Sequence, residues 1–200
     1  LARPFDAERL QFTGEAFPVA EQVHFFGVAD SAIFSVSDNG ILAYQPSAGG
    51  ERSRLLWIDR GGKQLESVGD VADYDHPRLS HDGRRVAVAV ADPQTTGTDI
   101  WIYDLSRRVS TRFTFVLAVN LAPIWSPDDS RIVFSSNRKG LHDLYQKAAS
   151  GAGNDELLLS SAIASMPLDW SPEGGLIAFR SVDMKPKSGV DIGVFSVAAG

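Results

Sequence analysis

A short acidic segment, Asp70 to His76, holds the densest group of side chains that could bind a metal ion. The carboxylates of Asp70, Asp73 and Asp75 are hard oxygen ligands of the kind that Ca²⁺ prefers. A calcium site needs about six or more oxygen ligands, however, and the spacing here follows no calcium-binding loop. We therefore expect a solvated loop over residues 70–76 and predict no metal site.

The histidines and serines form no catalytic or zinc-binding pattern in the sequence. The histidines, which lack the spacing of zinc ligands, are His24, His76, His81 and His142. No Gly-x-Ser-x-Gly string occurs, and the Gly-rich, His-Arg-Asp and Asp-Phe-Gly strings of protein kinases are missing too. We predict no catalytic residue and no cofactor. Paired carboxylates for sugar hydrolysis stay open, because a linear sequence gives no distance between acids.

Four copies of a serine-led turn organise the chain. They are Ser37-Asp38-Asn39-Gly40, Ser80-His81-Asp82-Gly83, Ser126-Pro127-Asp128-Asp129 and Ser171-Pro172-Glu173-Gly174. Their serines are separated by 43, 46 and 45 residues, a period typical of the blades of a radial β architecture. Proline, serine, aspartate and glycine suit a tight reversal. Ser126 and Ser171 are therefore interpreted as turn residues, and Asp129, which replaces a glycine, is expected to tolerate the left-handed conformation.

Each repeat is interpreted as four short strands. One approaches the turn, one leaves it, a third begins at an aspartate, and a fourth is a brief apolar run such as Arg112 to Phe115 or Glu156 to Leu159. Valines alternate with alanines from Val86 to Ala91, so both faces of that strand are apolar and both should be covered. We predict an all-β fold, a β-propeller of four-stranded antiparallel blades. Trp125 and Trp170, at equivalent positions, are expected to pack between blades.

The repeat divides the chain into about four blades of a single propeller domain. Residues 1–30 would end a preceding blade, with strands at Leu1 to Phe5 and Phe17 to Val23, and residues 163–200 would form an incomplete blade. Complete blades are predicted over residues 31–70, 71–117 and 118–162. We expect a fragment of a longer protein, as a partial arc of a larger propeller, with a four-bladed ring as the alternative. An open arc would expose an apolar blade face at each end.

Composition narrows the classes of partner. The chain has 200 residues, is 44% hydrophobic and 22% charged, and carries a formal net charge of −6. This composition suits a packed soluble domain, and an acidic chain argues against a nucleic-acid surface. There is no cysteine, which excludes disulfides and thiolate chemistry. No apolar run approaches the roughly 20 residues of a membrane-spanning helix, so no membrane segment is predicted.

The repeat resembles a known family. The pattern Pro-x-Trp-Ser-Pro-Asp, followed by an Ile-x-Phe strand and an Asp-Leu-Tyr strand, is similar to the TolB-like, or WD-repeat-like, β-propeller repeat, and it covers Pro123 to Ser135 and Pro167 to Ser181 best. More narrowly, Leu1 to Lys147 resembles the propeller C-terminal to bacterial eukaryotic-like serine/threonine kinase domains. Segments that carry this likeness are Arg3 to Asp6, Phe34 to Ser37, Leu42 to Tyr44 and Ser135 to Gly140.

The resemblance implies a non-catalytic module that senses a protein or ligand in the periplasm, tethered by a membrane segment outside this sequence. Prolyl-oligopeptidase relatives carry similar propellers, so an accessory gating propeller of a serine hydrolase is the alternative. In both cases the catalytic domain would lie elsewhere in the parent protein.

Variable loops on a rigid scaffold are the usual place for recognition. In a propeller, the connections from strand four to the next strand one, and from strand two to strand three, emerge on one face. We name this the loop face and predict that a protein or small ligand binds there and at the adjacent channel mouth. The predicted binding residues are Tyr74, Asp75, His76, Asn120, Arg138, His142 and Lys185, with Lys187 beside them.

Overall fold

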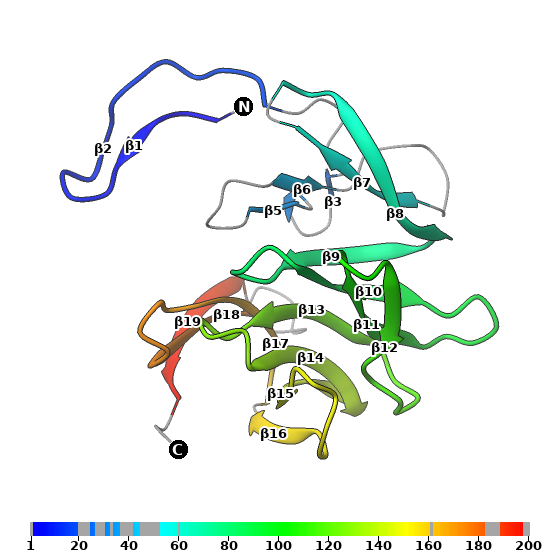
Figure 1. Cartoon of the computed structure of the whole chain (residues 1–200). Helices are drawn as coiled ribbons and strands as arrows, with labels where there is room; N and C mark the ends of the chain where they lie inside the picture. The colour runs from blue at the N-terminus through cyan, green and yellow to red at the C-terminus, as the bar shows by residue number, and fades with distance from the viewer. Residues whose placement is uncertain are drawn as a thin grey trace.

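The structure is a computed structural model, which describes residues 2–19, 25–26, 31–32, 34–36, 42–44, 53–59, 61–160, 162–182 and 189–197. Every regular element in these ranges is a β-strand. The strands form antiparallel sheets that follow one another along the chain (Figure 1). The predicted all-β fold with four-stranded antiparallel sheets is confirmed.

The N-terminal part contains pairs of short strands. The pairs are β1 (Phe5–Asp6) with β2 (Gln11–Phe12), β3 (Phe25–Phe26) with β4 (Ser31–Ala32), β5 (Phe34–Val36) with β6 (Leu42–Tyr44), and β7 (Ser53–Ile58) with β8 (Gln64–Ala72). The hairpin of β1 and β2 extends away from the sheets at the upper left of Figure 1. Ala2 forms an isolated bridge with Phe17, while Phe17 to Val23, predicted as a strand, lies partly outside the described residues.

Two four-stranded sheets follow β8 along the chain. The first contains β9 (Tyr74–Leu79), β10 (Arg85–Ala91), β11 (Thr98–Asp104) and β12 (Val109–Arg112), and the second contains β13 (Asn120–Trp125), β14 (Arg131–Lys139), β15 (Leu141–Ala148) and β16 (Glu156–Leu159). A three-stranded sheet of β17 (Ala164–Trp170), β18 (Leu176–Val182) and β19 (Val190–Ser196) follows. The first strands of the three sheets, β9, β13 and β17, lie next to one another. Each sheet therefore has its first strand at the inner side of the arrangement.

The core lies between neighbouring sheets. On β10, Ala87 and Ala89 pack with Trp125 of the following sheet, whereas Val86 and Val88 pack with residues of β7 and β8. Trp170 in turn packs against β13, β14 and β15. Both faces of the valine–alanine strand are therefore covered, and both tryptophans lie between sheets, as the repeat predicts. At about 25 cal/mol per Å² of buried apolar area, such contacts between sheets dominate the stability of the fold.

The serine-led turns have the geometry that their residues predict. Gly83, Asp129 and Gly174 occupy the same turn position, with φ of 69°, 56° and 75°. Asp129 thus adopts the left-handed conformation, which is unfavourable for most residues with a Cβ atom. Ser126 Oγ accepts a hydrogen bond from Arg131 N at 2.9 Å and donates one to Asp128 at 2.6 Å. These bonds hold the two arms of the turn together, and the hydrogen bonds from the Ser126 and Ser130 hydroxyls lower the pKa of Asp128 to about 2.

Three expectations about local structure are wrong. Residues 70–76 are not a solvated loop, because β8 runs to Ala72 and β9 begins at Tyr74. Arg138, expected in the connection between the second and third strands, lies within strand β14. The fourth strand of the first complete sheet stops at Arg112, so Phe113 to Phe115 lies beyond it. In the first two cases the β-ladder extends further than the apolar pattern indicates.

Candidate binding face

The beginning of β9 contributes three of the predicted binding residues to the loop face. Tyr74 is buried: its hydroxyl donates to Asp70 O at 2.8 Å and lies 3.0 Å from the Tyr103 hydroxyl. Burial, together with the hydrogen bond to Tyr103, raises the pKa of Tyr74. The Tyr74 side chain fills the junction between β8, β9 and β11, so its predicted role in binding would be to support the face from the interior.

Asp75 and His76 are partly exposed and form a pair. His76 Nδ1 lies 2.9 Å from Asp75 Oδ2, and Asp75 Oδ1 accepts a hydrogen bond from His76 N at 2.9 Å. His76 has a φ of 50°, at a register shift between β9 and β10. The shift turns the strand at this point, and Ala122, with the same φ, marks a similar shift between β13 and β14.

Asn120, another predicted binding residue, is buried at the start of β13. Its Nδ2 donates to Thr98 O at 2.9 Å, and its Oδ1 accepts a 3.3 Å hydrogen bond from Arg138 Nη2. Asn120 therefore links two sheets by hydrogen bonds in the interior, beneath the residues of the loop face.

Arg138 is largely buried by its ion pair and its ring contacts. Its Nη1 lies 2.7 Å from Asp155 Oδ2, and its guanidinium stacks 4.2 Å from the centre of the Tyr145 ring. Lys147 Nζ lies 3.4 Å from the other carboxylate oxygen of Asp155 and donates to Phe113 O. This cluster fixes the β14–β15 hairpin against the loop that precedes β13.

His142 connects its sheet to the next one through Ser135. The Ser135 hydroxyl donates to Ser165 O at 2.8 Å and lies 2.9 Å from His142 Nδ1, so Nδ1 carries a proton and donates to it. Burial lowers the pKa of His142, which keeps the ring neutral at pH 7. Lys185 and Lys187 lie outside the described residues.

The predicted residues thus divide into supports and surface groups. The structure brings Asn120 and Arg138 together, while no hydrogen bond or ion pair between described residues joins them to the Asp75–His76 pair or to His142. Asp75 and His76 are partly exposed, with side chains 23% and 31% accessible, and these two are available to a partner.

The prediction missed a group of exposed apolar residues on the loop face. Phe115, Val116 and Leu117, in the connection between β12 and β13, are 66%, 42% and 77% exposed. The signal was present in the sequence, because the apolar run from Phe113 to Leu117 is too long for the outer strand to which its first part was assigned.

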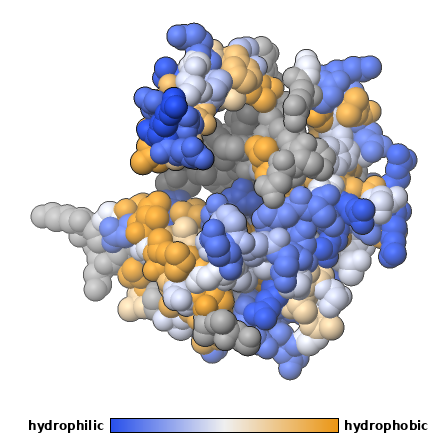
Figure 2. All heavy atoms as spheres, turned by 60° about the vertical axis from the view of Figure 1, so that its left-hand side comes forward, coloured by the Kyte–Doolittle hydropathy of each residue, from blue (hydrophilic) through white to orange (hydrophobic). Residues whose placement is uncertain are grey.

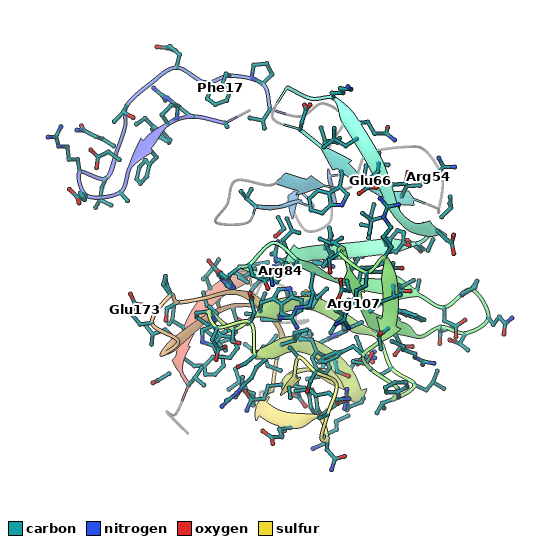
Figure 3. All side chains as sticks on the ribbon, viewed as in Figure 1. Phe17, Arg54, Glu66, Arg84, Arg107 and Glu173 are labelled. Atoms are coloured by element: carbon teal, nitrogen blue, oxygen red, sulfur yellow. The ribbon has the colours of Figure 1, made fainter. Side chains whose placement is uncertain are left out.

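A hollow lies on the opposite face, which we name the turn face and which carries the serine-led turns. It has a volume of about 450 Å³ and is lined by the ends of β9, β13 and β17, including Arg78, His81, Trp125 and Asp169. Arg84 and Glu173, labelled in Figure 3, lie in two of the turns on this face. Burial lowers the pKa of Arg78, and nearby Asp169 partly offsets this effect.

Two kinds of feature are absent from the part of the chain that the structure describes. No three His, Cys, Asp or Glu side chains there gather as metal ligands. No helix in those residues is long and apolar enough to cross a membrane.

Comparison with known proteins gives consistent matches. The family model of the TolB β-propeller domain matches residues 31–197. A Tol-Pal system protein TolB of Francisella tularensis subsp. tularensis is 27% identical over 165 residues, 82% of this chain, and that of subsp. mediasiatica matches equally. The chain spans 38% of the length of these relatives.

Solved structures show the same fold. TolB from Acinetobacter baumannii has a TM-score of 0.69 at 20% identity, covering 84% of this chain and 41% of that one. A prolyl endopeptidase gives a TM-score of 0.61 at 15% identity, covering 84% of this chain and 28% of that one. The tricorn protease gives a TM-score of 0.58 at 15% identity, covering 96% of this chain and 18% of that one.

Proposed function

We propose, from the premise that this chain belongs to the TolB β-propeller domain family, that it is a non-catalytic binding module whose loop face recognises a protein or a small ligand. The proposal places it in the periplasm, as part of a larger bacterial signalling protein such as a membrane-tethered serine/threonine kinase. The relatives named Tol-Pal system proteins support recognition of a protein partner.

One observation carries the proposal: the loop face is held in a fixed shape by buried polar contacts between sheets. Asp99 accepts from the Thr114 hydroxyl at 2.8 Å, Asn120 bonds to Thr98 and Arg138, and Arg138 pairs with Asp155. A pre-organised surface loses less conformational entropy when a partner binds. The same groups serve as mutual partners, which leaves them poorly suited to act as acids, bases or nucleophiles.

An accessory propeller of a prolyl-oligopeptidase-like hydrolase is the alternative. The likeness to a prolyl endopeptidase concerns the fold, because the identity is 15%. The reading frame that encodes this chain distinguishes the two parents. Kinase strings and a membrane-spanning segment support the first, whereas a hydrolase domain with a Gly-x-Ser-x-Gly elbow supports the second.

A binding experiment tests the loop face itself. Purified components of the Tol-Pal system are the first candidate partners, and their affinity for the wild-type chain would be measured by calorimetry. Replacing both Asp75 and His76 by alanine should weaken binding at least about tenfold, whereas Glu173→Ala, on the turn face, should leave the affinity within about twofold. Equal losses from both changes would contradict a site on the loop face.

A further inference from the structure

The connection between β12 and β13 leaves the core and displays three consecutive apolar side chains. Phe113 and Thr114 are 2% and 0% exposed, and the next three residues, Phe115, Val116 and Leu117, are the exposed group described above. We name these three residues the apolar tip. Single exposed apolar residues are ordinary, but contiguous ones mark an interaction site.

The residues on both sides of the tip are tied to the sheets. Before it, the Thr114 hydroxyl accepts from Ile100 N at 3.0 Å, and Thr114 O accepts from Arg112 Nε at 2.9 Å. After it, Ala118 O accepts from Thr98 N at 3.0 Å, and Val119 N donates to Asn137 Oδ1 at 2.8 Å. The apolar tip is therefore a short loop whose two ends are held by hydrogen bonds. These bonds restrict the number of conformations that the loop can adopt.

In the ion pair beside the apolar tip, the cationic side chain is more exposed to solvent than the anionic one. Arg112 pairs with Asp99, but the side chain of Arg112 is 41% exposed and that of Asp99 only 11%. The Arg112 guanidinium lies 5.4 Å from the centre of the Phe115 ring, and Lys147 Nζ lies 5.6 Å from it. A partner that covers Phe115 therefore meets the Arg112 guanidinium at the edge of the contact, whereas Lys147 is buried and paired with Asp155.

We propose that the apolar tip is the anchor by which the loop face binds a protein segment that combines aliphatic or aromatic side chains with acidic residues. This inference rests on the proposed function and names its partner class. Apolar anchors on a rigid support, surrounded by polar groups, carry most of the energy of protein interfaces. A lipid surface is the alternative occupant, and the vesicle arm of the test below distinguishes it from a protein segment.

The test uses random peptides displayed on phage, selected on the immobilised wild-type chain. Selected peptides should carry apolar side chains together with Asp or Glu. Phe115→Ser and Leu117→Ser should each weaken their binding at least about tenfold. Arg112→Gln should weaken the acidic peptides more at low salt than at high salt, because salt screens exposed charge.

The matched control is Ile192→Ser, which removes an equally exposed apolar side chain, 69% accessible, from β19. It should leave peptide binding within about twofold. Unchanged urea unfolding midpoints for all variants would establish that each is folded, as expected for exposed positions.

Three outcomes overturn the inference. The first is that no peptide sequence is selected, and the second is that the selected peptides bind the Phe115 and Leu117 variants as well as the wild type. The third is binding to phosphatidylcholine–phosphatidylglycerol vesicles that the same variants abolish, without peptide selection. If the Asp75/His76 double variant weakens peptide binding and the tip variants do not, the inference fails while the proposed function survives. If neither the Asp75/His76 double variant nor the tip variants weaken peptide binding, both the inference and the proposed function are contradicted.

Discussion

Asp129 illustrates how a single departure from the repeat acquires a role of its own. Its carboxylate accepts hydrogen bonds from His81 N and Asp82 N at 2.9 Å each and lies 2.9 Å from His81 Nδ1. Arg85, stacked 4.5 Å from the Trp125 ring, donates to Asp129 O at 3.0 Å. Where Gly83 and Gly174 only complete a turn, Asp129 fastens its turn to that of the preceding sheet.

We therefore predict a different response to two substitutions of Asp129. Asp129→Ala removes hydrogen bonds to a charged group, worth about 1.5–3 kcal/mol, and keeps the unfavourable left-handed backbone. Asp129→Gly loses the same bonds but relieves about 1 kcal/mol of backbone strain. Urea denaturation should give the order of stability wild type, then glycine, then alanine.

Asp129→Asn is the control, because asparagine tolerates the left-handed region and keeps one acceptor oxygen. It should lie between the wild type and the glycine variant. A glycine variant more stable than the wild type would mean that the carboxylate contributes nothing across the two turns.

The elements differ in how far the sequence predicts them. β10 and β14 were predictable because valine–alanine alternation and the Ile-x-Phe pattern have the period of a strand covered on both faces. The end of β8 was not, because it lies in a segment with three aspartates, Asp70, Asp73 and Asp75, and its pairing depends on Ser53 across the hairpin. Backbone pairing with the neighbouring strand β7 has no signature in the composition of this segment, so the acidic segment was interpreted as a loop.

Gly69 shows what that strand does in the structure. It has a φ of 71° at a register shift in β8, and a Cβ there would lie 2.6 Å from Tyr103 Cε1 and 2.9 Å from the Tyr74 hydroxyl. Both rings are inflexible and meet edge to face with centroids 6.1 Å apart. The glycine therefore allows β8 to pass close to the sheet that follows it.

We predict that Gly69→Ala lowers the free energy of unfolding by about 1–3 kcal/mol more than Gly62→Ala does. Gly62 also has a positive φ, 82°, but a Cβ there would meet nothing within 4 Å. Backbone strain, about 1 kcal/mol, is therefore common to both variants, and the difference isolates the clash with the tyrosines. Equal losses in urea denaturation would show that the rings move aside at no cost.

For the molecule as a whole, the sequence predicts that neighbouring sheets pack against each other, but it does not predict which residues make the contacts. The repeat indicates that neighbouring sheets cover each other, and Glu66 on β8, labelled in Figure 3, confirms one such link by accepting a 2.8 Å hydrogen bond from Arg108. The contacts at the loop face depend on distances between side chains, which the spacing of residues in the repeat does not give. Asn120 and Arg138 were predicted as binding residues of the loop face, and the structure joins them by a hydrogen bond in its interior, whereas the exposed apolar tip was not predicted.

The repeat also gives one position that is buried in two sheets and exposed in a third. Ile100 on β11 and Leu144 on β15 are fully buried by the sheet that follows, whereas Ile192 on β19 is 69% exposed beside Val190 and Val194. The side of the molecule that carries β19 comes forward in Figure 2, where apolar surface gathers on its lower part. The same residue type thus stands in two environments on one scaffold.

We predict that Ile100→Ala lowers the free energy of unfolding by about 2–5 kcal/mol, because it leaves a cavity between sheets, whereas Ile192→Ala changes it by less than about 0.5 kcal/mol. Both would be measured by urea denaturation at low protein concentration, where self-association is weakest. Sedimentation velocity at higher concentration should detect association through the exposed face, and Ile192→Asp should reduce it because a carboxylate there resists burial. If Ile192→Ala were as costly as Ile100→Ala at every concentration, the outer face of β19 would have to be covered within a single molecule, and the exposure on which this contrast depends would be refuted.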